Sequence, residues 1–124
     1  MALKAILTVD RNPRNLELLG QFLQKEGYMT LPVSTLENFK AVLDQAEDMG
    51  LALVDISGFD RSIWAYYERL SDRGVPLMII SPRQIGEIQK ESIMRGARGV
   101  LFKPLVVKEL IKIVRKMLLQ GSKS

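Results

Sequence analysis

Four side chains that could act together on a phosphoryl group follow four short apolar runs of the sequence. Asp10 and Asp55 each come directly after such a run, Ser81 follows a third, and Lys103 follows the last. Two carboxylates can hold a hard cation such as Mg²⁺, or one of them can act as a nucleophile. A hydroxyl can bond a phosphoryl oxygen, and a lysine supplies positive charge to the same group. This set of groups suits transfer of a phosphoryl group to an aspartate.

Each of these residues also has an ordinary structural explanation when it is taken alone. An aspartate after a strand commonly caps a turn, a Ser-Pro pair opens a loop, and a Lys-Pro pair ends a strand. Their joint occurrence after four separate apolar runs is what favours a shared chemical site. The chain contains no cysteine and no histidine, which excludes disulfides, thiolate and imidazole metal ligands, and histidine-based triads.

The composition and length are those of one globular domain. Hydrophobic residues make up 47% and charged residues 26% of the 124 residues, a balance that argues against disorder. We expect one domain over residues 1–121, followed by a polar tail over residues 122–124. The N-terminus lacks the pattern of a signal peptide, and no segment approaches the roughly 20 apolar residues of a membrane span. We therefore expect a cytoplasmic protein that does not enter a membrane.

Short apolar runs alternate with longer amphipathic segments along the chain. The runs are too short for helices and predict strands over 5–9, 51–54, 77–80 and 100–102, with a weaker edge strand over 28–33 that Pro32 interrupts. This alternation predicts an α/β fold, in which helices cover both faces of a doubly wound parallel sheet of five strands. Ligands of such sheets bind outside the carboxyl ends of the strands, which is where the four polar residues fall.

The amphipathic segments predict five helices. The first begins near Pro13 and ends before Gly27, and its inward stripe comprises Leu16, Leu19, Phe22 and Leu23. The second follows the sequence Ser-Thr-Leu-Glu at residues 34–37, which has the spacing of a capping box. Further helices are predicted over 61–70, 84–95 and 107–120.

Taken together, these segments resemble the receiver domain of two-component response regulators, the CheY-like family. The resemblance spans residues 3–119 and implies a flavodoxin-like (βα)5 sheet with strand order 2-1-3-4-5. The residues that carry it are Ile6-Leu7-Thr8-Val9-Asp10, Leu51-Ala52-Leu53-Val54-Asp55, Pro76-Leu77-Met78-Ile79-Ile80-Ser81, Gly96-Ala97 and Phe102-Lys103-Pro104.

The resemblance also implies a role for each polar residue. Asp55 is the expected phosphoacceptor, loaded by a histidine kinase or a phosphotransfer protein, and Ser81 is the expected switch hydroxyl. Lys103 is expected to pair with the acceptor carboxylate, and the peptide bond after it is expected to be cis. Asp10 and Asp55 are the expected Mg²⁺ ligands, together with the backbone carbonyl of Ser57. Such a domain is a signalling switch rather than an enzyme, with at most self-phosphorylation and dephosphorylation at Asp55.

Several positions depart from the family pattern. Arg11 stands where the family has a second acid after the first strand, which predicts weaker Mg²⁺ binding. Pro82 follows the switch hydroxyl and has no N–H to offer a phosphate. Val100 replaces the aromatic residue on the last strand that normally couples to the switch. Arg83 lies two residues after Ser81, within reach of the pocket, where it would attract anions.

These departures leave two functions open. The first is a phosphorelay switch that is phosphorylated on Asp55. The second is a degenerate receiver that acts as an interaction module regardless of phosphate. The second function would use the basic surface of the helix over 84–95, the last strand and the last helix, to bind an acidic partner or a second copy. The expected residues of this surface are Arg95, Arg98, Lys108, Lys112 and Arg115.

The charge distribution supports a basic surface but not a nucleic-acid interface. Residues 83–124 carry 10 Lys and Arg against 3 Asp and Glu, so this part of the chain is strongly positive. Aromatic residues that would stack on bases are few, which disfavours nucleic acid as a partner. A nucleotide or flavin carrier is also disfavoured, because the loop after the first strand has no glycine-rich phosphate motif.

Overall fold

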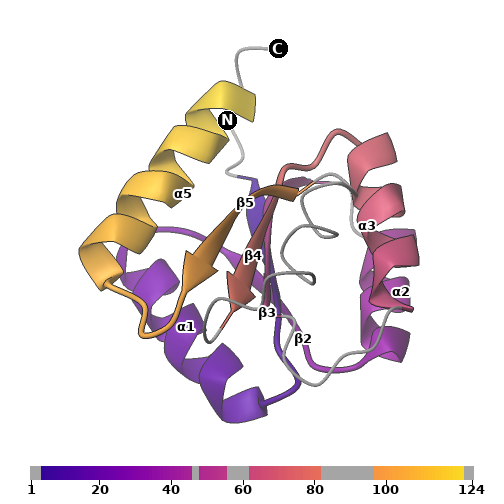
Figure 1. Cartoon of the computed structure of the whole chain (residues 1–124), viewed down its shortest axis with the longest axis horizontal. Helices are drawn as coiled ribbons and strands as arrows, with labels where there is room; N and C mark the ends of the chain where they lie inside the picture. Colours follow the sequence, from indigo (N-terminus) through magenta and orange to yellow (C-terminus); the bar gives the residue numbers. More distant parts are fainter. Residues whose placement is uncertain (1–3, 46–47, 56–61, 82–96, 122–124) are drawn as a thin grey trace.

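Five parallel strands form a single sheet in the computed structural model, in the order β2-β1-β3-β4-β5 (Figure 1). The structure describes residues 4–45, 48–55, 62–81 and 97–121. The elements along the chain are β1 (Ala5–Val9), α1 (Pro13–Lys25), β2 (Thr30–Val33), α2 (Leu36–Gln45), β3 (Met49–Asp55), α3 (Ile63–Asp72), β4 (Leu77–Ser81), β5 (Ala97–Phe102) and α5 (Val107–Gly121). The predicted fold class and strand order are confirmed. The helix predicted over 84–95 lies outside the described residues.

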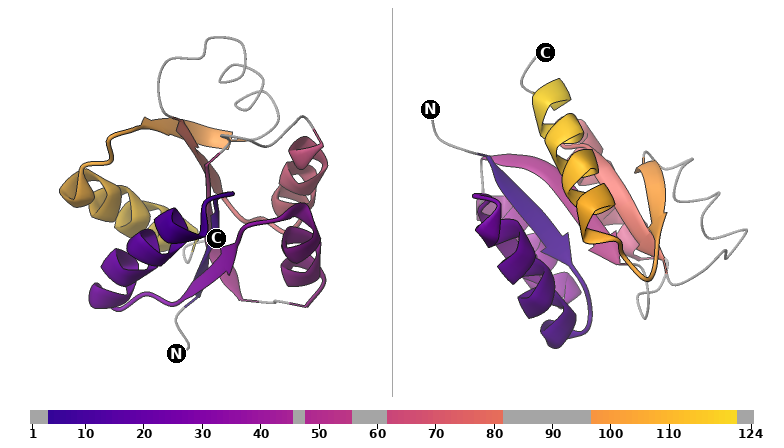
Figure 2. Two further views of the ribbon diagram at one scale, coloured as in Figure 1. Left: turned by 90° about the horizontal axis from the view of Figure 1, so that it is seen from below. Right: turned by 90° about the vertical axis from the view of Figure 1, so that its left-hand side faces the viewer.

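The sheet separates two layers of helices. Helices α1 and α5 cover one face, and α2 and α3 cover the other (Figure 2). The strands β1, β3 and β4 are buried along their whole length, which is why they appear as continuous apolar runs. Alternate residues of β3 supply the two cores: Leu51 and Leu53 face α1 and α5, while Ala52 and Val54 face α2 and α3.

Local signals set the ends of the first two helices. The Asn12 side chain accepts a hydrogen bond of 2.9 Å from the Arg14 N–H, and Pro13 follows in the first turn, as predicted. The chain leaves α1 through Gly27, whose φ of 89° favours glycine. The cap of α2 differs from the prediction: the Thr35 hydroxyl accepts the Asn38 N–H at 3.1 Å, so the capping pair is one residue later than the predicted box.

Two strands begin earlier than their apolar runs. β3 begins at Met49 rather than residue 51, because Met49 already pairs with Ala5 of β1. β5 begins at Ala97 rather than residue 100. As an edge strand it pairs on one side only, and its residues Arg98 and Gly99 carry no apolar signal. β2 forms the other edge, as Pro32 predicted, with that proline exposed.

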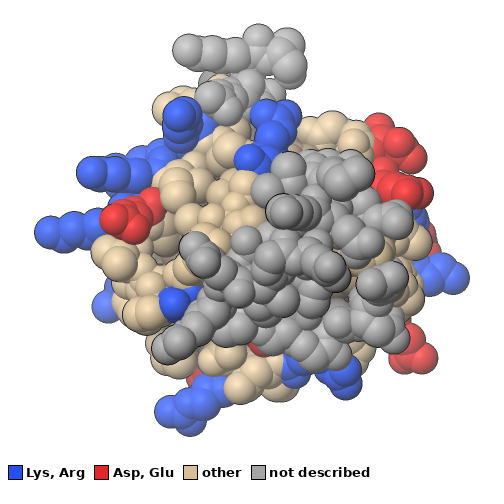
Figure 3. All heavy atoms as spheres, viewed as in Figure 1, with Lys and Arg blue, Asp and Glu red and all other residues tan. Residues whose placement is uncertain are grey.

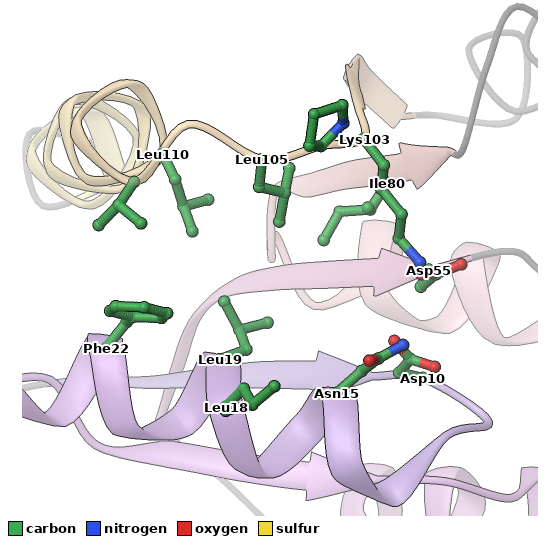
Figure 4. Close-up of a pocket in the computed structure, with 12 residues that line it drawn as sticks. Asp10, Asn15, Leu18, Leu19, Phe22, Asp55, Ile80, Lys103, Leu105 and Leu110 are labelled. Atoms are coloured by element: carbon green, nitrogen blue, oxygen red, sulfur yellow. Dashed lines mark ion pairs between the residues drawn. The ribbon is translucent and has the colours of Figure 1, made fainter.

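The first helix also corrects a core prediction. Leu16 and Leu23 are buried, as predicted. Phe22 was also predicted to face inward but is 43% exposed, and its neighbour Leu18 is 46% exposed. Both lie on the part of α1 that faces α5 (Figure 4). In the part of the chain that the structure describes, no helix is long and apolar enough to cross a membrane.

Candidate functional site

The four polar residues predicted to act together lie at one edge of the sheet. Parallel pairing of β1 with β3, of β3 with β4, and of β4 with β5 brings the carboxyl ends of all four strands to the same side. Asp10 follows β1, Asp55 ends β3, Ser81 ends β4 and Lys103 follows β5. Figure 4 shows Asp10, Asp55 and Lys103 converging at this edge. Ser81 is completely buried there, in register with the end of β5.

Asp55 and Lys103 form an ion pair at the centre of the site. The lysine Nζ contacts Oδ2 of the Asp55 carboxylate, which is itself buried. The backbone N–H of Lys103 donates to the Ser81 carbonyl at 2.9 Å, which fixes the start of the loop after β5. The Lys103–Pro104 peptide bond is cis, as the family resemblance implied. The lysine stem therefore reaches the acceptor carboxylate from a strand two positions away in the sheet.

Asp10 lies beside this pair and is held by its own loop. Its Oδ1 accepts a hydrogen bond of 2.8 Å from the Asn12 backbone N–H. Burial raises the pKa of the Asp10 carboxyl, and the negative charge of Asp55 raises it further. Hydrogen bonds from the Asn12 N–H and the Asn15 side chain, together with the positive charge of Lys103, act in the opposite direction but do not cancel the rise. Two like charges therefore share this edge.

We predict that Asp10→Asn stabilises the fold at neutral pH by about 1 kcal/mol, as substitutions that remove functional strain often do. Asparagine keeps an oxygen for the Asn12 N–H but removes the charge. A carboxyl whose pKa is raised by folding weakens stability as pH rises through that pKa. The gain should thus be present above the folded pKa and should vanish below the unfolded value. Urea denaturation of both proteins across this pH range measures it, and a gain that persists in acid would contradict the explanation.

Several predicted residues are at the site's margin or outside the described residues. Arg11 is exposed, directly after Asp10. Val100 is half-buried against the core beneath α2 and α3. Ser57, Pro82 and Arg83 fall in segments that the structure does not describe, so their predicted roles stay predictions.

The predicted basic surface is described in part. Arg98 on β5 and Lys108, Lys112 and Arg115 on α5 are exposed, while Arg95 falls outside the described residues. Figure 3 shows Lys and Arg side chains gathered on the side of the molecule where α5 lies. Arg115 already forms an ion pair within the chain, since its guanidinium contacts the Glu26 carboxylate at 3.1 Å.

Asn15 is a residue of the site that the sequence did not single out. It lies in the first turn of α1, and its side chain donates to the Asp10 carboxylate. Helical spacing places Asn15 on the same helix face as Leu18, Leu19 and Phe22, so the sequence shows a polar residue just before an apolar stripe. The spacing gave no means of telling whether that stripe faced the core or an open space.

The same fold is found in solved receiver domains. A CheY-like receiver domain protein from Methanospirillum hungatei JF-1 matches with a TM-score of 0.87 and 27% identity, covering 98% of each chain. A receiver domain protein from Clostridium thermocellum matches with a TM-score of 0.84 and 15% identity, covering 97% of this chain and 98% of that one. No protein-family model matches the chain.

Sequence comparison points to the same class. The chain is 25% identical over 113 residues to the heme response regulator HssR of Staphylococcus saprophyticus, a match that covers 90% of this chain and 50% of that protein. The chain thus spans about half the length of this curated relative. The fold is that of a response regulator receiver domain of the CheY-like class.

Proposed function

We propose that this chain is a phosphorelay switch that accepts a phosphoryl group on Asp55 from a histidine kinase or a phosphotransfer protein. The observation that carries the proposal is the buried Asp55 carboxylate, paired with Lys103 and flanked by Asp10 at the open edge of the sheet. A purely structural ion pair would not require a second carboxylate beside it.

The rate of the transfer step depends chiefly on how the protein positions the reacting groups and stabilises their charge. One Asp55 carboxylate oxygen attacks the phosphorus, the new O–P bond forms, and the bond from phosphorus to the donor's nitrogen or oxygen breaks with its electron pair on the donor. Lys103 neutralises charge on the phosphoryl oxygens as it is released from the carboxylate. The Ser81 hydroxyl, at the end of the neighbouring strand, donates to a phosphoryl oxygen in the product. The protein itself has at most self-phosphorylation and dephosphorylation activity.

The two carboxylates suit Mg²⁺, although they form a small ligand set. Asp10 and Asp55 supply oxygen ligands. Burial is the main cause that raises the pKa of Asp10, and a cation between the two carboxylates would relieve the repulsion from Asp55 that adds to it. Among the described residues no group of three or more acids gathers, and Arg11 occupies the next position. We propose weak Mg²⁺ binding by Asp10, Asp55 and the Ser57 carbonyl. When bound, the ion supplies positive charge to the phosphoryl oxygens.

Incubation with acetyl phosphate and Mg²⁺ tests this function. We expect intact mass spectrometry to show the gain of one phosphoryl group on the wild type and none on Asp55→Asn. Asp44→Asn is the matched control, because Asp44 is an exposed acid on α2, paired with Arg69 and remote from the site. It should be phosphorylated like the wild type. Absence of a gain on the wild type, or a gain retained by Asp55→Asn, would refute the proposal.

A second candidate function is a degenerate receiver that binds a partner without phosphorylation. The exposed cations Arg98 on β5 and Lys108 and Lys112 on α5 favour it, because they form a surface suited to an acidic protein or a second copy. The same Asp55→Asn variant separates the two functions. If the chain is a phosphorelay switch, acetyl phosphate should change partner binding by the wild type but not by Asp55→Asn. A phosphate-independent module binds its partner equally well in both forms.

A further inference from the structure

A cavity of about 570 Å³ opens between α1 and α5, with the acidic edge at one end. Its size is within the range of pockets that hold small organic ligands. The apolar wall comprises Leu18, Leu19, Phe22, Leu105, Val107 and Leu110. In Figure 4 Leu18, Leu19 and Phe22 line the side formed by α1, opposite Leu105 and Leu110.

The exposed residues of α1 are explained by this cavity. Leu18 and Phe22 are nearly half exposed, although they lie on the helix face that is turned toward α5. The ion pair between Glu26, the residue that follows α1, and Arg115 of α5 lies beyond this stretch, at the end of α1 remote from Asp10. A ligand between the helices would remove this apolar surface from water, which is favourable in proportion to the area covered.

Among the described residues that line the cavity, the charged ones at its polar end have an excess of one negative charge. Asp55 and Lys103 neutralise one another in their ion pair. Asp10 also lines the cavity, and it makes no ion pair with any residue in the described part of the chain. The Asn12 N–H and the Asn15 side chain hold its carboxylate through neutral donors, which leave the charge uncompensated. The head group that complements this end is therefore a cation.

We propose that this cavity binds a small amphipathic cation, in which an ammonium group is attached to an aryl or branched alkyl body. The ammonium pairs with the Asp10 carboxylate, and the body lies between Leu18 and Phe22 on one side and Leu105 on the other. An anionic head group in the same position would meet the uncompensated Asp10 carboxylate and be repelled. This binding does not require phosphorylation of Asp55, and its test uses unphosphorylated protein without Mg²⁺.

Three matched probes test the chemistry of the head group: tryptamine, its alcohol analogue tryptophol, and indole acetate, which share an indole body. In ¹H–¹⁵N NMR titrations of the wild type, we expect tryptamine to shift the amides of Asn15, Phe22 and Leu105. It should bind on the order of tenfold more tightly than tryptophol, because its donor to the Asp10 carboxylate is a charged ammonium rather than a neutral hydroxyl. Indole acetate should bind most weakly.

Three variants locate the binding. Asp10→Asn should abolish the preference for tryptamine over tryptophol, since it removes the charge and keeps the side chain's shape. Phe22→Gln should weaken both probes equally, because it shortens the apolar wall. Leu119→Gln is the control, as Leu119 is an exposed apolar residue of α5 outside the cavity. It should bind both probes like the wild type.

Other occupants of the cavity give different results. If the wild type bound tryptamine and tryptophol equally, the cavity would bind the indole body without selecting a charged head group, and this result would overturn the proposal. So would a preference for tryptamine that survives in Asp10→Asn, or titrations in which no probe shifts these amides. Sedimentation that shows a wild-type dimer, lost in Phe22→Gln, would assign the cavity to a second copy instead. None of these outcomes depends on whether Asp55 accepts phosphate.

Discussion

The Lys103→Met variant is expected to lose about 2–3 kcal/mol of unfolding free energy, as removal of one partner from a buried ion pair leaves the other charge uncompensated. The Asp55 side chain is only 3% exposed, so water cannot replace the ammonium. The lysine side chain is 33% exposed, which places the expected loss below that of a fully buried pair. Methionine retains the apolar stem, so the loss reports the charge rather than the packing.

A double-mutant cycle that combines Lys103→Met with Asp55→Asn separates the contribution of the ion pair to stability from that of side-chain packing. Once Asp55 is neutral, Lys103→Met should cost little, and the coupling free energy from urea denaturation should approach the loss in the single variant. Arg69→Met is the control, because the Arg69–Asp44 pair has a 2.6 Å contact but its side chains are 40% and 48% exposed. Its loss should stay within about 0.5 kcal/mol. Additive effects in the Lys103–Asp55 cycle would contradict the explanation.

The Arg11→Asp variant is expected to bind Mg²⁺ at least about tenfold more tightly than the wild type. The substitution changes the charge beside Asp10 and Asp55 by two units. A unit charge about 4 Å away contributes roughly 4 kcal/mol at an effective dielectric constant near 20, and solvent screening of the exposed position reduces this several-fold. A remainder of about 1.4 kcal/mol corresponds to a factor of ten. Isothermal titration calorimetry measures the two affinities directly.

Arg14→Asp is the matched control for this prediction. Arg14 is also exposed, at the start of α1, and the substitution makes the same change in net charge. Its effect on Mg²⁺ affinity should be much smaller, because Arg14 does not adjoin Asp10 in sequence as Arg11 does. Equal tightening by the two variants would show that total charge, rather than the residue beside Asp10, sets the affinity. An unchanged affinity in Arg11→Asp would remove Arg11 as the cause of weak binding.

The sheet was predictable because its central strands are buried on both faces. Such strands are mostly apolar, so β1, β3 and β4 stand out in the sequence as short apolar runs, despite Thr8 in β1 and the polar residues that end β3 and β4. The edge strands lack this requirement. The weak pattern over β2 and the missed beginning of β5 at Ala97 follow from pairing on one side only.

The sequence alone determined which polar residues follow the strands, and therefore that Asp10, Asp55, Ser81 and Lys103 would share one edge of a parallel sheet. The family resemblance also implied that Lys103 pairs with Asp55. Only the tertiary structure decided that Asp10 stays outside that ion pair, and that Phe22 borders a cavity instead of the core. The reason is that the spacing of apolar residues shows which side of a segment is to be buried, and this can be read from each segment alone. Pairing and open space depend on the register of strands and the separation of helices, which arise only when distant segments pack together.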